Sequence, residues 1–163
     1  MVYEAESTTR RFILKALRES WGELYGQFGG LDEHALRWRP ARGEWCLKEL
    51  AGHLRDAERL YQRQLDLIAV EHEPHLPYEP VDVFPFESDY RAQPLHRLLA
   101  EYEAAREDTF WTLRMLDEDD WSRTGIHPYR GRVTVADLAR EMHEHDLEHL
   151  YQAQRLRRDA PRR

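Results

Sequence analysis

Apolar residues recur every three or four positions along four long stretches of this chain, which is the period of an amphipathic α-helix. The first stretch carries apolar residues from Ile13 to Phe28 and ends at the glycine pair 29–30. Similar stretches predict a second helix over 47–68, a third over 95–116 and a fourth that runs to about residue 158.

The connections between these stretches carry turn and loop residues. The segment 71–94 contains five prolines, which are expected to prevent helix before Pro94, and it is long enough to cross the length of a bundle between two helices. Gly125, Pro128 and Gly131 predict a loop or a short β-hairpin before the last helix. Thr134 and Asp137 resemble a capping box, with Asp in place of the usual Glu or Gln. The predicted fold class is therefore all-α, a four-helix bundle with a long crossover connection and a small β element in its third loop.

Length and composition indicate one globular domain over residues 1–158, followed by a basic carboxy-terminal tail at 159–163. The chain has 163 residues, of which 41% are hydrophobic and 34% are charged, so it can bury a core without disulfides. A net charge of −7 argues against a nucleic-acid partner, and no apolar run reaches the roughly 20 residues of a membrane span. The single cysteine, Cys46, gives no indication of an oxidising compartment, so we expect a cytoplasmic location.

Two histidines of the fourth helix lie on the stripe that faces the interior of the bundle. His145 and His149 are four residues apart, so their side chains project from the same face of the helix. On the second helix, His53 lies one turn from Leu50 and Ala57, within the apolar face. The pattern predicts a site built from His53, His145 and His149.

Three neutral imidazoles suit a transition metal better than Ca²⁺ or Mg²⁺, which prefer oxygen ligands. Zinc is the first choice, and Ni²⁺, Fe²⁺ and Cu²⁺ are alternatives. Three protein ligands leave a coordination position for water or substrate, as in catalytic zinc sites. Residues 145–149 also spell H-x-x-E-H, an inverted zinc-protease motif in which Glu148 is the general base. Only fourteen residues follow His149, too few for the further ligand that such enzymes need, so we favour the three-histidine site.

Other residues have weaker indications. Gln152 and Asp56 each lie one turn from a predicted ligand, so either could orient it through a hydrogen bond or simply bond within the bundle. Cys46 precedes the second helix and is either a reactive thiol or a buried apolar residue. The tryptophans at 38, 45 and 121 are expected to pack rather than to stack on a substrate. The remaining histidines are expected to point away from the site, in loops or toward solvent; they are His34, His72, His75, His96, His127 and His143.

Two regions of the chain carry a specific combination of residues: Arg39, Pro40, Trp45, Lys48, Glu49, Leu50, His53, Leu54, Asp56, Glu58, His145, Asp146, His149 and Gln152. In order and spacing these regions resemble the signature regions of the DinB-like superfamily, in its YfiT-like group, and the match covers most of the chain. The resemblance implies an up-down-down-up four-helix bundle, a metal held by His53, His145 and His149, and a homodimer. It also implies activities such as metal-dependent transfer or isomerisation with a low-molecular-weight thiol, for example bacillithiol, mycothiol or glutathione.

Two hypotheses of function follow. The first is a metal-dependent enzyme, a thiol S-transferase or a hydrolase that acts on small molecules. The second is a metal-binding stress or interaction protein without turnover, in which the metal stabilises the bundle. An accessible pocket beside the metal would favour the enzyme, whereas a fourth protein ligand would favour the structural role.

Overall fold

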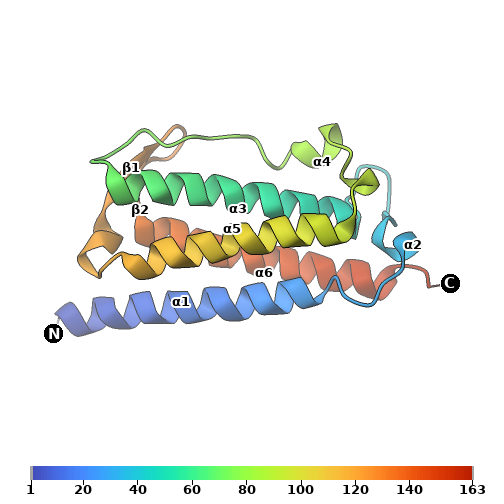
Figure 1. Cartoon of the computed structure of the whole chain (residues 1–163), viewed down its shortest axis with the longest axis horizontal. Coiled ribbons are helices and arrows are strands. Elements are labelled where there is room, and N and C mark those ends of the chain that lie inside the picture. The colour runs from blue at the N-terminus through green and yellow to red at the C-terminus, as the bar shows by residue number, and fades with distance from the viewer. Residues whose placement is uncertain (1, 163) are drawn as a thin grey trace.

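Four long helices form the body of the protein. The computed structural model describes residues 2–162, and Figure 1 shows helices α1 (Val2–Gly26), α3 (Leu47–Val70), α5 (Leu95–Met115) and α6 (Val135–Asp159) side by side. Their bounds lie within a few residues of the predicted ones, except that α1 begins at Val2, well before the apolar stripe that starts at Ile13. Helix α1 ends at Gly26, before the glycine pair, because residues 27–30 form turns. The predicted all-α bundle is confirmed. Within the described residues, no helix is both long and apolar enough to cross a membrane.

The direction of the helices gives the bundle its topology. Helices α1 and α6 run one way along the long axis, and α3 and α5 run the other way (Figure 1). The order along the chain is therefore up-down-down-up, as the family resemblance implied. Because α3 and α5 are parallel neighbours, the chain must travel the length of the bundle between them, which explains the long connection 71–94.

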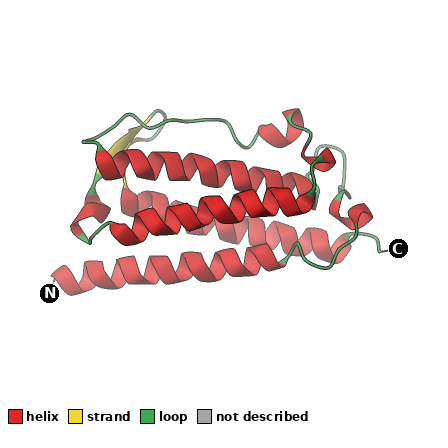
Figure 2. Cartoon of the chain, in the orientation of Figure 1, coloured by secondary structure: helices red, strands yellow, loops and turns green. Residues whose placement is uncertain are grey.

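Short elements interrupt the connections, which the sequence pattern predicted only as loops. These elements are α2 (Glu33–Leu36), α4 (Phe84–Glu87) and the 3₁₀ turns η1 (Tyr90–Ala92) and η2 (Asp119–Ser122). The expectation that prolines exclude helix from the crossover is wrong at α4, because Pro85 occupies its first turn, where a missing amide hydrogen has no intrahelical partner to lose. Each of these helices is a single turn (Figure 2).

A two-stranded hairpin precedes the last helix. Strand β1 (Thr124–His127) pairs antiparallel with β2 (Gly131–Thr134), and the positive φ of Gly131 (73°) is a conformation that favours glycine. The predicted β element is confirmed, and the predicted capping box forms between Thr134 and Asp137. His127 was expected in a loop, but it belongs to β1 and is buried against the body of the protein.

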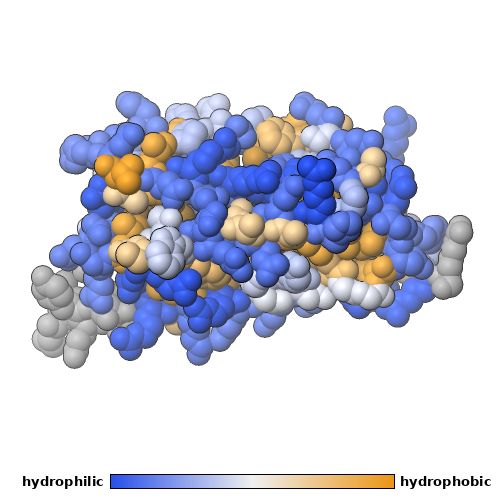
Figure 3. Space-filling model, viewed as in Figure 1, coloured by the Kyte–Doolittle hydropathy of each residue, from blue (hydrophilic) through white to orange (hydrophobic). Residues whose placement is uncertain are grey.

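Apolar residues from all four long helices fill the interior, while the face in Figure 3 is mostly hydrophilic. Trp121 is buried in one core cluster and Trp38 packs against the other. The crossover is fixed onto α3 at Gly52, where an added Cβ would lie 2.4 Å from the ring of Tyr90. That contact accommodates only glycine without rearrangement.

A buried ionic network links three helices beside the histidines of α6. The guanidinium of Arg106 on α5 donates to both oxygens of Asp146 on α6, at 2.7 and 2.9 Å, and lies 2.9 Å from a carboxylate oxygen of Glu58 on α3. Ser20 of α1 donates a further hydrogen bond of 2.7 Å to Asp146. Burial raises the pKa of Glu58, although Arg106 opposes this effect. The network holds Asp146, and with it the turn of α6 between His145 and His149, in one place.

Candidate metal centre

Helices α3 and α6 bring the three predicted histidines to one point. The Nε2 atom of His53 lies 3.1 Å from the Nε2 atoms of both His145 and His149, and those two atoms are 3.0 Å apart. His53 and His149 are buried and His145 is partly buried. Among the described residues, this is the group of metal-ligand side chains that comes together with such spacing.

Hydrogen bonds at the opposite ring nitrogens orient two of the imidazoles. The Nδ1 atom of His53 lies 3.1 Å from the carbonyl oxygen of Val81, and Nδ1 of His149 lies 2.8 Å from Oε1 of Gln152. A backbone carbonyl can only accept, so Nδ1 of His53 carries the proton and its Nε2 has a free lone pair. The amide oxygen of Gln152 has the same effect on His149. Of the two interpretations of Gln152, the contact therefore favours the one in which it orients a predicted ligand.

Neutral imidazoles are favoured at this site. Burial and the neighbouring His149 lower the pKa of His53 to about 4, and burial, His149 and His53 lower the pKa of His145 well below its ordinary value. At neutral pH these side chains are unprotonated bases. Since neutral histidine is the form that binds a metal, the site is prepared for one without the release of protons.

The residues fit a divalent metal ion. Two of the facing Nε2 atoms are hydrogen-bond acceptors without a proton between them, so their approach to 3.1 Å is unfavourable unless a cation lies there. Zn–N bonds of about 2.0–2.1 Å in a tetrahedral site place ligand nitrogens roughly 3.3 Å apart, close to the distances in this cluster. Nitrogen donors of this kind suit zinc, nickel or iron rather than calcium.

A cavity of about 440 Å³ opens beside the three histidines. His145 and His149 form part of its wall together with Trp45, whose ring lies 4.8 Å from that of His53. Trp45 was expected only to pack, but it also shapes this cavity. The other lining residues are Gly43, Glu44, Asp82, Phe86, Glu148, Gln152 and Arg155.

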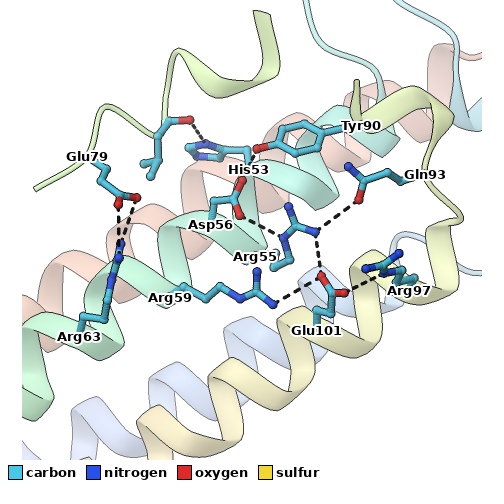
Figure 4. Close-up of polar contacts among 11 residues, drawn as sticks. His53, Arg55, Asp56, Arg59, Arg63, Glu79, Tyr90, Gln93, Arg97 and Glu101 are labelled. Atoms are coloured by element: carbon cyan, nitrogen blue, oxygen red, sulfur yellow. Dashed lines mark hydrogen bonds and ion pairs between the residues drawn. The ribbon is translucent and has the colours of Figure 1, made fainter. Parts of the chain in front are cut away.

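Asp56 does not contact the histidine cluster. Its carboxylate accepts hydrogen bonds from Tyr90 and from Arg55, which also pairs with Glu101 of α5 (Figure 4). The bundle hydrogen bond was the other interpretation of this residue, and the contacts favour it. Asp56 therefore fixes the crossover to α3 through Tyr90, and Arg55 links α5 to α3 through Glu101.

Several residues of the site were not identified from the sequence. Val81 contributes a backbone carbonyl, which no side-chain motif encodes. Asp82 follows it in the crossover and places a carboxylate oxygen 3.7 Å from Nε2 of His53. Tyr61 lies about two turns beyond His53 on α3. Its ring centroid is 6.1 Å from that of His145. Its spacing of eight residues from His53 was the one available signal.

The remaining candidates lie as follows. Glu148 is exposed and lines the cavity, but it lies outside the histidine cluster. Cys46 is fully buried, and burial raises the pKa of its thiol to about 11, which favours the packing interpretation over a reactive thiol. His143 contacts Ser20, away from the site, and His34, His72, His75 and His96 are exposed.

The topology and the histidine cluster together define a class of protein: an up-down-down-up four-helix bundle with three histidines from two helices converging beside an open cavity. The model of the DinB superfamily matches residues 16–153, so the chain belongs to this superfamily. It is 24% identical over 161 residues to the protein YuaE of Bacillus subtilis (strain 168), covering 91% of this chain and 96% of YuaE.

Solved structures share the fold. YfiT from Bacillus subtilis, a probable metal-dependent hydrolase with an unusual four-helix bundle topology, superposes with a TM-score of 0.82 at 17% identity over 91% of this chain and 86% of YfiT. A mycothiol-dependent maleylpyruvate isomerase gives a TM-score of 0.71 at 14% identity over 87% of this chain and 59% of the isomerase. At these identities the structures establish the fold and no more.

Proposed function

We propose that this protein is a metal-dependent enzyme that acts on small molecules, as a hydrolase or as a thiol S-transferase. The observation that carries the proposal is the convergence of three Nε2 atoms, two with free lone pairs, at the wall of an open cavity. The similarity to YfiT, a probable metal-dependent hydrolase, supports the first of these reactions, and the similarity to a mycothiol-dependent isomerase supports the use of a thiol.

Each residue has a task that its contacts support. His53, His145 and His149 would hold the ion, while the Val81 carbonyl and Gln152 keep two of the rings in the binding tautomer. A divalent ion with an open position supplies Lewis-acid activation of a water or a thiol at neutral pH. Trp45 and Phe86 give the cavity apolar walls, and Arg155 lines it as a guanidinium paired with Glu44 at 3.0 Å. These three side chains would bind the substrate or the thiol.

Zinc is the proposed metal, with nickel and iron as alternatives, because imidazole ligands suit all three. A low-molecular-weight thiol is the proposed second substrate of the transferase reaction. We further propose that the protein is a cytoplasmic homodimer, in line with the family resemblance.

The alternative function is metal binding without turnover. In that case the ion would only stabilise the bundle, by the binding free energy that favours the folded state. The observation against it is the cavity, because a purely structural site is closed by a fourth protein ligand and needs no opening. The carboxylate of Asp82 lies 3.7 Å from Nε2 of His53, but its side chain is 82% exposed and leaves the site open.

Metal content per chain, measured by elemental analysis of the purified protein, tests the proposal. We expect one equivalent of metal in the wild type and less than a tenth of it in His53→Ala, His145→Ala and His149→Ala, with His96→Ala as the exposed control. A wild type that carries no metal and takes up neither zinc nor nickel contradicts the metal site. Metal-loaded protein is then assayed with thiols and small electrophiles, and binding without turnover would favour the alternative.

A further inference from the structure

A second, smaller cavity of about 170 Å³ meets the histidine cluster. It shares two lining residues, His145 and Asp82, with the larger cavity, so both chambers reach the metal site. At roughly 30 Å³ per water molecule, it has room for about six water molecules or one small ligand of similar volume. The rest of its wall comes from α3, the crossover, β1, the hairpin turn and α6.

One buried side chain presents an unused donor to this chamber. The Nδ1 atom of His127 accepts hydrogen bonds from the backbone N–H groups of Tyr129 (3.2 Å) and Arg130 (3.3 Å), at the hairpin turn. Because Nδ1 accepts, the proton of the neutral ring lies on Nε2. Burial and Arg130 lower the pKa of His127, so the ring is neutral at pH 7. Only 7% of His127 is exposed, and the hydrogen bonds of its ring to other described residues are those at Nδ1, so the Nε2–H is left to water or a ligand in the chamber that His127 lines.

The arginine that lines the chamber is already paired with a carboxylate, so it is not free to bind an anionic ligand. Arg130 is paired with Glu141, which also accepts a 3.1 Å hydrogen bond from Tyr61. Glu79 is paired with Arg63. The chamber therefore offers a ligand no unpaired arginine, and the donor that remains for a ligand oxygen is the Nε2–H of His127.

Aromatic rings provide the walls. Tyr61 lines the chamber beside His145, with ring centroids 6.1 Å apart, and the ring of Tyr78 meets that of His127 edge-on at 5.6 Å. Aromatic walls favour a flat apolar body over a strongly hydrated one. The chamber thus combines two aromatic walls, one buried donor and a path to the metal ligand His145.

We propose that this chamber binds the small carbonyl compound on which the enzyme acts, with its neutral carbonyl oxygen accepting a hydrogen bond from Nε2–H of His127. The proposal rests on the proposed function and adds a division of the site to it: the carbonyl compound occupies the tyrosine-lined chamber, and the larger cavity beside Trp45 and Arg155 receives the co-substrate. His127 is a binding residue for this substrate.

Benzamide and toluene are suitable probes, because they have the same ring and only benzamide carries a carbonyl oxygen. Both are titrated into zinc-supplemented protein and followed by NMR, and the zinc content of the same sample is measured. We expect nuclear Overhauser effects from the benzamide ring to Tyr61 and Tyr78. In His127→Asn, the Asn side chain still offers an oxygen to the turn but lacks the Nε2–H, so benzamide should bind about fivefold more weakly. His96→Asn, an exposed change on α5, should bind as the wild type does.

Each outcome decides one part of the proposal. Toluene binding as tightly as benzamide, or an unchanged benzamide affinity in His127→Asn, overturns the carbonyl assignment. Zinc-loaded protein without contacts from benzamide to the tyrosines refutes the chamber while the metal site stands. Contacts in a sample that holds no zinc refute the proposed function while the chamber stands. The first comparison uses only wild-type protein, so it decides even if His127→Asn does not fold.

Discussion

The hydrogen bond between Gln152 and His149 gives the sharpest quantitative prediction. Replacement of Gln152 by Leu removes the acceptor at 2.8 Å from Nδ1, so His149 is free to rotate and to place its proton on Nε2, the atom that binds the ion. Loss of such a supporting bond costs 10- to 100-fold in metal affinity. Since Gln152 is only partly buried, water can replace part of the bond. We therefore expect a loss near the lower end, about tenfold or 1.4 kcal/mol.

The assay is competition for zinc between the protein and a chromophoric chelator at pH 7.5. Gln152→Glu keeps an acceptor at this position and should bind zinc within about threefold of the wild type. Gln154→Leu, an exposed change two residues along α6, is the control for loss of an amide from the helix and should have no effect. Equal zinc affinity in Gln152→Leu and wild type would refute the idea that this bond prepares His149 for the metal.

Three further changes test the fold around the site. The pKa of His53 is about 4 in the folded protein against 6.5 in the unfolded chain, so as the pH falls the unfolded chain takes up this proton first. The metal-free protein should therefore lose about 3 kcal/mol of unfolding free energy between pH 6.5 and 4. An unfolding free energy from urea titrations that stays constant across this window contradicts the shift. Arg106→Met leaves buried carboxylates without their cation and should cost about 3–5 kcal/mol, a fall in Tm of about 10 °C by calorimetry; a fall as small as that of Arg59→Met, at an exposed ion pair, would show that the network is not stabilising. Gly52→Ala should destabilise by about 1–3 kcal/mol because it meets the tyrosine ring packed on it, whereas Gly22→Ala, in open space on α1, should stabilise by up to about 1 kcal/mol; equal effects at the two glycines in urea unfolding would refute the contact.

The sequence was sufficient to predict what depends on local periodicity. The apolar stripes predicted the four helices, and Thr134 with Asp137 predicted the start of α6, because both signals act within a few residues. The same periodicity placed His145 and His149 on the inner face of α6 and His53 on that of α3. Their convergence could be predicted because two inward faces of one bundle share a narrow interior.

The rest of the site depends on how distant segments pack. The carbonyl of Val81 reaches His53 only because the crossover lies over α3, and its path is set by contacts such as Tyr90 on Gly52. His127 was predicted in a loop because hairpin turn residues surround it, but tertiary packing buries it. Arg106 was overlooked because a charged residue on a helix is usually exposed, and only the folded chain brings carboxylates from two helices to it.

The parallel arrangement of α3 and α5 has a consequence for how such proteins diversify. The segment that joins them also supplies Val81, Asp82 and Phe86 to the wall of the site, so one stretch of chain serves both connectivity and substrate choice. Its length and side chains can change by insertion or exchange without altering either helix that carries the histidines, because loops tolerate such changes better than packed elements. A library within residues 82–88 would therefore vary the wall of the cavity while the Val81 carbonyl and the two helices stay the same.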